Sequence, residues 1–351
     1  MQSKEIASTP RTITQAGLQN SSARLVPENS IILSTRAPIG HLAINTQPMA
    51  FNQGCRGIVP GSRLNHQFLY YFLLASRSEL DDLGTGATFK ELSSSALRLF
   101  EVPVPPMDEQ KRLVAVLDQA FTTLDRARAN AEVNLSDVDS LQTAVVKGQF
   151  AGRESWPAEP LGARVRFIDY RGRTPAKTES GVPLLTAKNV RMGYVKDEPR
   201  EFIAREAYTS WMTRGIPKRG DVLFTTEAPL ANVAQVETDE PVALAQRLIT
   251  MQPPAGAINS RFLKWSLMSP QMQADITEKG TGATVTGIKA SLLKLIPLHL
   301  PDLDRQQQIA EVCESAFLFR AKLRNEIEAK LADLAALRQS LLEAAFSGQL
   351  S

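Results

Sequence analysis

The sequence has few of the residues from which most enzyme and metal sites are built. It contains two cysteines and three histidines in 351 residues. Cys55 and Cys313 lie at non-equivalent places, and with the histidines they are too few for a metal cluster of ordinary ligand count. His41, His66 and His299 are isolated in the sequence, and such histidines more often pack or face solvent than catalyse. The low cysteine content predicts a reducing, cytoplasmic setting.

Other functional signatures are also absent. No glycine-rich phosphate loop ends in Gly-Lys-Ser or Gly-Lys-Thr, and no Gly-x-Gly-x-x-Gly follows an expected strand. No apolar run approaches the length of about 20 residues that crosses a bilayer, and the N-terminus lacks a signal-peptide core. Forty Lys and Arg against 37 Asp and Glu give a net charge of +3, which permits nucleic-acid binding without requiring it. We therefore expect a soluble protein, and an enzyme with an unrecognised site is the least favoured class.

What the chain does contain is a long internal repeat. The sequence GTGAT at 84–88 recurs at 280–284, an offset of 196 positions (280 − 84), and the match continues to residues 152 and 348. Upstream, residues 30–44 resemble residues 221–235. A repeat of this length indicates two domain-sized copies rather than a solenoid, and the 43% hydrophobic content can form two cores. Residues 156–190 have no counterpart in the first copy.

Each copy ends in a segment with the pattern of a long helix. Apolar residues recur at alternating spacings of four and three from Leu113 to Val145, and the pattern returns from Ile309 to Leu341. Neither proline nor glycine interrupts residues 108–147, so the helix would be roughly 60 Å long at about 1.5 Å per residue. The two helices are predicted to pair with each other; the alternative is that each packs only on its own domain. Asn134, Lys330 and Arg320 either fix the pairing register or face solvent.

The rest of each copy has a mixed pattern of strands and helices. In the first copy, β-branched alternation predicts strands, helical periodicity predicts a helix, and a proline turn precedes the long helix. The expected elements are strands over 30–44 broken at Pro38 and Gly40, a strand in 51–60, a helix over 66–83, a glycine loop at 84–88 and a short strand in 97–105. Asp108 and Asp304 are expected to cap the long helices.

Two features could bind nucleic acid. In the GTGAT loops, small residues and Thr hydroxyls allow close approach to a ligand, and exposed N–H groups could meet a phosphate, although a tight turn explains them equally well. Basic residues gather around the loop 170–175, and guanidinium groups reach both phosphates and base edges. Scattered arginines also serve solubility. These residues alone leave DNA binding open.

A resemblance to a known family gives more specific expectations than these residues alone. Pro105-Pro106 with Glu109-Gln110 at the start of the first long helix, the GTGAT loops, and the Phe-x-Gly sequences at 150–152 and 346–348 resemble the specificity subunit of type I restriction-modification enzymes. The resemblance covers nearly the whole chain. It implies an α+β fold, with two globular α/β target recognition domains separated by two long antiparallel conserved-region helices that form a coiled coil. The implied division is 1–104 and 153–300 for the recognition domains, and 105–152 and 301–351 for the helices.

The same resemblance implies a function. The chain would be a non-catalytic subunit that reads a double-stranded DNA target in two halves, with the helices as a ruler between them. It would bind no cofactor directly. Its partners would be two methyltransferase subunits, which bring S-adenosylmethionine, and two restriction (motor-nuclease) subunits, which use ATP and Mg²⁺. The first recognition domain is shortened at its N-terminus relative to the second. The rival is a coiled-coil protein-assembly adaptor that does not bind DNA.

Two sets of residues follow from this interpretation. We predict no catalytic and no metal-binding residue. The predicted DNA-binding residues are Arg36, Gln53, Arg56, Thr85, Thr88, Arg171, Arg173, Lys177, Lys188, Arg191, Gln246, Thr281 and Thr284. The residues predicted to pack between the long helices are Leu117, Leu124, Leu141, Leu323, Ile327, Leu334 and Leu337.

Overall fold

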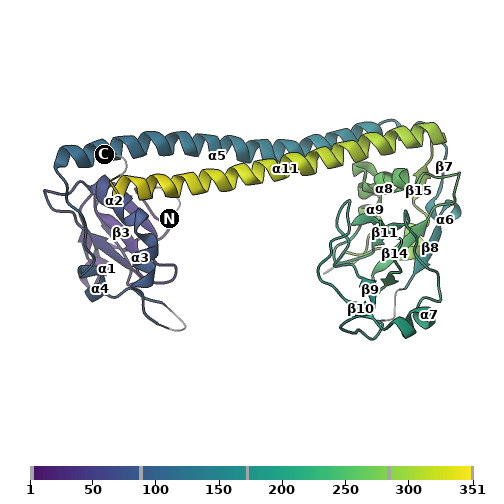
Figure 1. The fold of residues 1–351 in the computed structure, drawn as a ribbon, viewed down its shortest axis with the longest axis horizontal. Helices are drawn as coiled ribbons and strands as arrows, with labels where there is room; N and C mark the ends of the chain where they lie inside the picture. Colours follow the sequence, from purple (N-terminus) through teal and green to yellow (C-terminus); the bar gives the residue numbers. More distant parts are fainter. Residues whose placement is uncertain (1–3, 87–89, 171–173, 283–285, 349–351) are drawn as a thin grey trace. The chain divides into compact units, whose positions relative to one another are not determined.

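The chain forms two compact units. The computed structural model describes residues 4–86, 90–170, 174–282 and 286–348. Unit 1 comprises residues 1–133 and 327–351, and unit 2 comprises residues 134–326. The two long helices of Figure 1, α5 (Met107–Gln149) and α11 (Leu303–Phe346), each contribute one part to each unit. The predicted combination of two mixed α/β domains and two long helices is therefore confirmed.

Unit 1 is built on a four-stranded sheet with the order β1-β4-β3-β6. The central strand β3 is rich in isoleucine and leucine, and it pairs antiparallel with β4 and β6, while β1 joins β4 in parallel. Asn65 caps α2, because its side-chain oxygen accepts from the amides of Gln67 and Phe68. The elements are β1 (Glu5–Ile6), α1 (Gln15–Gln19), β2 (Leu25–Val26), β3 (Ile31–Ser34), β4 (Leu42–Asn45), β5 (Met49–Ala50), β6 (Cys55–Ile58), α2 (His66–Ala75), α3 (Arg77–Asp82) and α4 (Ser94–Arg98).

Unit 2 repeats this plan and adds to it. Its sheets have the orders β12-β11-β14-β8, β10-β9-β13 and β15-β7. The strands are β7 (Ala158–Pro160), β8 (Arg166–Asp169), β9 (Val182–Leu185), β10 (Phe202–Ile203), β11 (Val222–Thr225), β12 (Val233–Gln235), β13 (Ala243–Leu244), β14 (Leu248–Gln252) and β15 (Pro297–His299). The helices are α6 (Leu161–Arg164), α7 (Tyr208–Trp211), α8 (Ser260–Met268), α9 (Pro270–Glu278) and α10 (Ala290–Leu293), with two short 3₁₀ turns, η1 (Arg153–Ser155) and η2 (Arg205–Ala207).

The segment without a counterpart explains one wrong expectation. In unit 2, residues 156–190 supply β7, which pairs with β15, and β8, which pairs with β14. The residues equivalent to β15 are 101–103, within the short strand expected at 97–105. The structure ends α4 at Arg98, and residues 99–105 take part in no strand pairing with described residues. The expectation of a strand is wrong because local β-propensity needs a pairing partner to form a strand.

Each unit encloses a core that includes parts of both long helices. In unit 1, Leu117 and Phe121 of α5 and Leu342 of α11 pack with Phe68 of α2. In unit 2, the corresponding contacts are made by Val146 of α5 and Phe150 directly after it, Ile309 and Cys313 of α11, and Phe262 of α8. Burying one large apolar side chain stabilises a fold by about 1.5–3 kcal/mol. The long helices are therefore part of the domain cores as well as partners of each other.

The helices pair in antiparallel fashion. In unit 1, the Arg338 guanidinium lies 2.5 Å from Asp125 and 4.1 Å from the centre of the Phe121 ring. In unit 2, Asp139 receives Arg320 at 2.7 Å and Arg324 at 3.1 Å. Partner numbers fall along α11 as they rise along α5, which defines the antiparallel direction. Arg320 thus takes part in pairing, whereas Asn134 and Lys330 are exposed.

The residues that are buried between the long helices do not follow a strict heptad repeat along the whole of each helix. Leu117 and Leu124 are buried, and Leu323, Ile327 and Leu334 are half-buried. Leu141 and Leu337 are 56% and 48% exposed, so their predicted place between the helices is wrong. Gln142 and Arg338, one residue later, are half-buried instead. An α-helix has 3.6 residues per turn, and a heptad position therefore rotates by about 20° per repeat.

Repeated polar contacts fix where the long helices start. Buried Gln110 accepts the Asn65 amide at 2.7 Å and donates to the Pro105 carbonyl at 2.8 Å; Gln306 makes the matching bonds to Asn259 and Pro301, both at 2.9 Å. Both helices begin earlier than expected, and the capping position lies two residues before the predicted aspartate. Asp302, not Asp304, accepts the Arg305 amide at 2.8 Å, and α5 begins at Met107, which places Asp108 inside its first turn.

A carboxylate on each long helix binds an aromatic donor and a lysine. In unit 2, Glu314 accepts Lys264 at 2.7 Å and the Trp265 indole at 3.0 Å. In unit 1, the equivalent Asp118 accepts the Tyr71 hydroxyl and, at 2.5 Å, Lys4. Burial, followed by the bond to Asp118, raises the pKa of Tyr71 well above its ordinary value.

Across the described part of the chain, no helix is both long and apolar enough to traverse a bilayer.

Candidate nucleic-acid interface

In unit 1, four of the predicted DNA-binding residues lie close together at one end of the sheet. The chain leaving β3 is joined to residue 54 by the bond from the Thr35 amide to the Gly54 carbonyl, 2.8 Å long. Thr85 and Glu91 exchange two backbone hydrogen bonds at 3.0 and 2.9 Å, which closes the glycine loop as a hairpin. Arg36 forms a backbone bridge with Glu91. Gln53, in the turn before β6, and Arg56, on β6, therefore lie near the hairpin base and Arg36.

The two arginines of this surface are held differently. The Nε atom of Arg36 lies 3.2 Å from a Glu91 carboxylate oxygen, and its side chain is 58% exposed. Arg56 donates through Nε to the Ser94 hydroxyl at 3.0 Å and through Nη1 to the Gln53 carbonyl at 3.0 Å. Arg56 is thus largely committed to hydrogen bonds with Ser94 and with the turn before β6, whereas Arg36 has a single carboxylate partner and is exposed to solvent.

Unit 2 presents the same frame. Thr281 and Gly287 exchange backbone bonds at 2.8 and 2.9 Å, and Glu227 forms a backbone bridge with Gly287. The Thr226 amide donates to the Arg247 carbonyl at 3.1 Å, which places the exposed residue Gln246 next to this hairpin. Gln246 and Thr281 are therefore brought together, as Gln53 and Thr85 are in unit 1.

The remaining cationic candidates of unit 2 lie elsewhere. Lys177 forms an ion pair with Glu201 at 2.8 Å. Lys188 is exposed and Arg191 half-exposed on a loop held by the buried amide of Asn189, which binds Thr186, Lys196 and Pro199. This loop approaches α11, because a Cβ at Gly193 would touch the Phe317 ring. Thr88, Arg171, Arg173 and Thr284 lie outside the described residues.

Three residues of these surfaces escaped the sequence reasoning: Glu91, Glu227 and Arg247. The Nε atom of Arg247 lies 2.9 Å from a Glu227 carboxylate oxygen, next to the predicted Gln246. Their counterparts in the other copy are Gly287, Arg36 and Gly54, so matching the two copies did not select them. A search for charged residues next to the shared positions would have found them.

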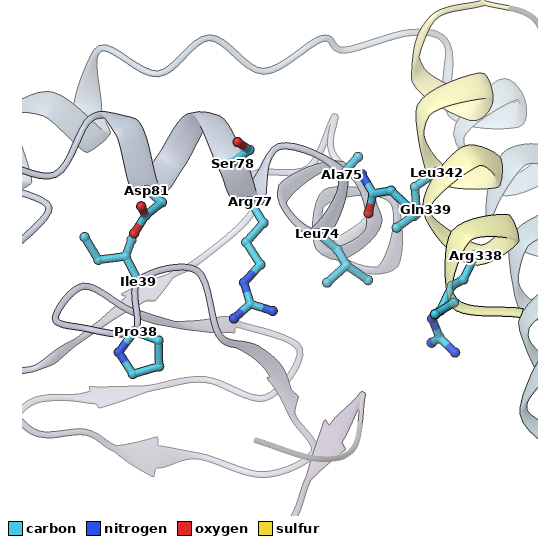
Figure 2. Close-up of a pocket in the computed structure, with 11 residues that line it drawn as sticks. Pro38, Ile39, Leu74, Ala75, Arg77, Ser78, Asp81, Arg338, Gln339 and Leu342 are labelled. Atoms are coloured by element: carbon cyan, nitrogen blue, oxygen red, sulfur yellow. The ribbon is translucent and has the colours of Figure 1, made fainter. Parts of the chain in front are cut away.

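A separate groove of about 550 Å³ lies in unit 1 between α3 and α11. Figure 2 shows Arg77, Asp81 and Arg338 among its lining residues. These charges already have partners: Arg77 lies 3.2 Å from His41, Asp81 binds Lys90 at 2.7 Å, and Arg338 binds Asp125. Burial, and then the charge of Arg77, lower the pKa of His41. We assign no ligand to this groove.

Within the described ranges, no group of three or more His, Cys, Asp or Glu side chains could hold a metal ion.

Comparison with known proteins gives one consistent family. A family model described as the type I restriction modification DNA specificity domain matches residues 3–135 and 212–332. The chain is 23% identical over 381 residues to the EcoKI specificity subunit of Escherichia coli (strain K12), covering 100% of this chain and 81% of that protein. It is 36% identical over 125 residues to the MjaIX specificity subunit of Methanocaldococcus jannaschii, which covers 35% of this chain and spans 29% of that relative.

Solved structures share the fold. A chain from a type I R-M system, studied for its complex assembly and conformational transition, aligns with a TM-score of 0.78 at 18% identity, covering 94% of this chain and 85% of that chain. The crystal structure of the HsdS subunit from Thermoanaerobacter tengcongensis gives a TM-score of 0.61 at 17% identity, covering 94% and 84%. At these identities the likeness speaks to the fold alone.

Proposed function

The chain belongs to the type I restriction modification DNA specificity family, and we propose on that basis that it is the DNA sequence-recognition subunit of a type I restriction-modification complex. The observation that carries the proposal is the duplicated surface. Each unit places a glutamine, a threonine and an ion-paired arginine beside a glycine-rich hairpin. Two like surfaces on one chain suit a target read in two halves.

The proposal extends to the division of labour along the chain. Residues 1–104 and 153–300 would be the two recognition domains, and residues 105–152 and 301–351 the helices that space them. The antiparallel pairing contacts at Asp125 and Asp139 support a stiff spacer. Both helices contribute residues to the core of each unit, so each recognition domain would be anchored to both helices.

The partners and cofactors are also part of the proposal. We expect two methyltransferase subunits that carry S-adenosylmethionine and two restriction subunits that use ATP and Mg²⁺, with this cytoplasmic chain itself non-catalytic. The names of its relatives as specificity subunits support that role. A coiled-coil adaptor without DNA binding remains the competing function for the test to separate.

The test is DNA binding by the chain assembled with its methyltransferase subunits. Methylome sequencing of cells that carry the system would identify the split target sequence, from which the duplex for the binding assay is made. Affinity should fall steeply as salt increases, because phosphate contacts release counterions, with a slope of about −0.9 per contact. Arg128→Gln, on the exposed face of α5 where Arg128 pairs with Glu132, is the matched control and should leave binding unchanged. Assembly without salt-dependent binding would support the adaptor instead.

A further inference from the structure

Each of the two recognition surfaces has one arginine paired with a carboxylate, but the two surfaces take the arginine and the carboxylate from opposite positions. Arg36 and Glu227 are equivalent: each directly precedes an Ala-Pro pair and forms the backbone bridge to the hairpin. In unit 1 the arginine lies on this strand end and the carboxylate, Glu91, on the hairpin. In unit 2 the carboxylate lies on the strand end and the arginine, Arg247, comes from the neighbouring turn.

Gly287 allows the carboxylate in unit 2 to come from Glu227 and the arginine to come from position 247. It takes the place of Glu91, so position 287 itself has no side chain that could compete for the Glu227 carboxylate. A Cβ added at Gly287 would lie 3.2 Å from the Cβ of Glu227 and 3.2 Å from the Thr226 carbonyl, which is tighter than an ordinary contact. The absence of a side chain at 287 leaves room for Glu227 to bind Arg247.

The backbone of this site in unit 2 is also unusual. Arg247 has φ 69°, Ala228 has φ 47° and Ala231 has φ 63°, all in the left-handed region that non-glycine residues avoid. The first copy has glycine at two of these positions, Gly40 for Ala231 and Gly54 for Arg247. Unfavourable backbone conformations that persist in this way cluster at functional sites. Arg247 therefore occupies a position where the backbone conformation would suit glycine better.

We propose that Arg247 reads a guanine in the half of the target contacted by unit 2, and that Glu227 is the residue that positions it. A Glu227 carboxylate oxygen lies 2.9 Å from Nε, and no other side-chain partner of Arg247 occurs in the described part of the chain, so the two terminal NH₂ groups can face the DNA. A planar pair of donors matches the O6 and N7 acceptors of guanine in the major groove. Arg36, held by Glu91, is the counterpart in unit 1. This inference rests on the proposed function.

The test uses the full complex with its methyltransferase subunits and duplexes that vary one base pair at a time. Arg247→Gln and Arg247→Lys should each lose the preference for guanine at one position of one half-site, by roughly 5- to 150-fold, since a bidentate contact discriminates by about 1–3 kcal/mol. Glu227→Gln should weaken the same preference at the same position. Arg36→Gln should act on the other half-site.

Two further variants control for backbone strain at position 247 and for the general loss of a surface arginine. Arg247→Gly installs the residue of the first copy, relieves the left-handed backbone, and should lose the preference while the domain stays folded. Arg219→Gln removes a comparably exposed arginine, paired with Asp239 at 3.1 Å at the far end of β11, and should leave the target unchanged. A uniform loss of affinity for all sequences would make Arg247 a phosphate contact and overturn the proposal, as would an unchanged target. A wild-type complex that does not bind DNA would instead refute the proposed function.

Discussion

The buried ion pair of Glu314 with Lys264 gives a direct test at the scale of single residues. Lys264 is 2% exposed at its side chain, whereas Glu314 is 25% exposed. Glu314→Gln leaves the lysine charge buried without a counter-charge, and we expect it to lower the free energy of unfolding by about 3 kcal/mol. Lys264→Met leaves a carboxylate that reaches water and still accepts the Trp265 indole, so we expect a loss of only roughly 1 kcal/mol.

Tryptophan fluorescence can measure this loss in unit 2 alone. The three tryptophans, Trp156, Trp211 and Trp265, all lie in that unit. Denaturant titration followed by this signal should show the larger shift for Glu314→Gln. Equal shifts for the two variants would mean that Lys264 is less isolated from water than its burial indicates.

The two cysteines predict different thiol reactivity. Burial, and then the charge of Glu314, raise the pKa of Cys313 from 9.0 to about 12, so the folded chain keeps this thiol protonated. We expect an alkylating reagent near pH 8 to modify half-buried Cys55 and to spare Cys313, with mass spectrometry to locate the label. Because the folded pKa exceeds the unfolded one, Cys313 stabilises the fold fully below about pH 9 and loses that contribution as pH rises toward 12. Rapid labelling of Cys313 in the native chain would contradict its burial.

At the residue scale, equivalent residues of the two copies occupy matching places, while their role in DNA binding stays a prediction. Gln53 and Gln246, and likewise Thr85 and Thr281, occupy matching places in the two surfaces. Arg247 was missed because its counterpart is Gly54, and its partner Glu227 because acidic residues are not expected to face DNA. A positioning ion pair is a property of three-dimensional contact, so neither partner identifies it in the sequence alone.

At the scale of elements, the Phe-x-Gly ends of the long helices anchor them in the domains. Phe150, fully buried, packs on Phe262 with ring centres 5.7 Å apart, and half-buried Phe346 packs on Phe68 at 5.4 Å. Phe150→Ala should destabilise unit 2 by about 3–5 kcal/mol, the usual cost of a buried Phe→Ala change. Phe346→Ala should cost less because its ring is partly exposed.

Tryptophan fluorescence, which reports on unit 2, distinguishes the two variants. Phe150→Ala should shift the unfolding transition seen by fluorescence. Phe346→Ala should leave that transition in place, while circular dichroism, which reports on both units, shows a lower stability that belongs to unit 1. If Phe346→Ala shifted the tryptophan signal by the same amount, the two units would have to unfold as one cooperative block.

Elements were predictable where local pattern and pairing agree. Residues 30–44 formed β3 and β4 with the turn at Gly40, whose φ of 85° suits glycine. The strand at 97–105 failed because β7, the partner of its equivalent β15, belongs to a segment with no counterpart in the first copy. The heptad reading failed at Leu141 and Leu337 because small errors in period accumulate along a helix of 43 residues.

At the scale of the whole molecule, duplication accounts for both the symmetry and its exceptions. Each long helix begins at one unit's core, with Gln110 or Gln306, and ends in the other unit's core, with Phe150 or Phe346. Every residue that anchors a helix therefore has an equivalent in the other copy. The residues that differ, such as Arg36 and Glu227, lie at the surfaces proposed to read DNA, where two halves of a target can differ.

If the paired helices set the distance between these surfaces, lengthening both should lengthen the spacer of the target. Seven residues inserted after Val133 in α5 and after Glu326 in α11 add about 10.5 Å and preserve the buried face. At about 34 Å per turn of 10 base pairs, the methylated target should keep both half-sites and gain roughly 3 base pairs between them. Methylome sequencing of cells with the altered chain measures the spacer. An insertion in α5 alone is the control and should abolish activity, because it breaks the pairing of Asp139 with Arg320 and Arg324. An active double insertion with an unchanged spacer would show that the spacing is set elsewhere than in the helices.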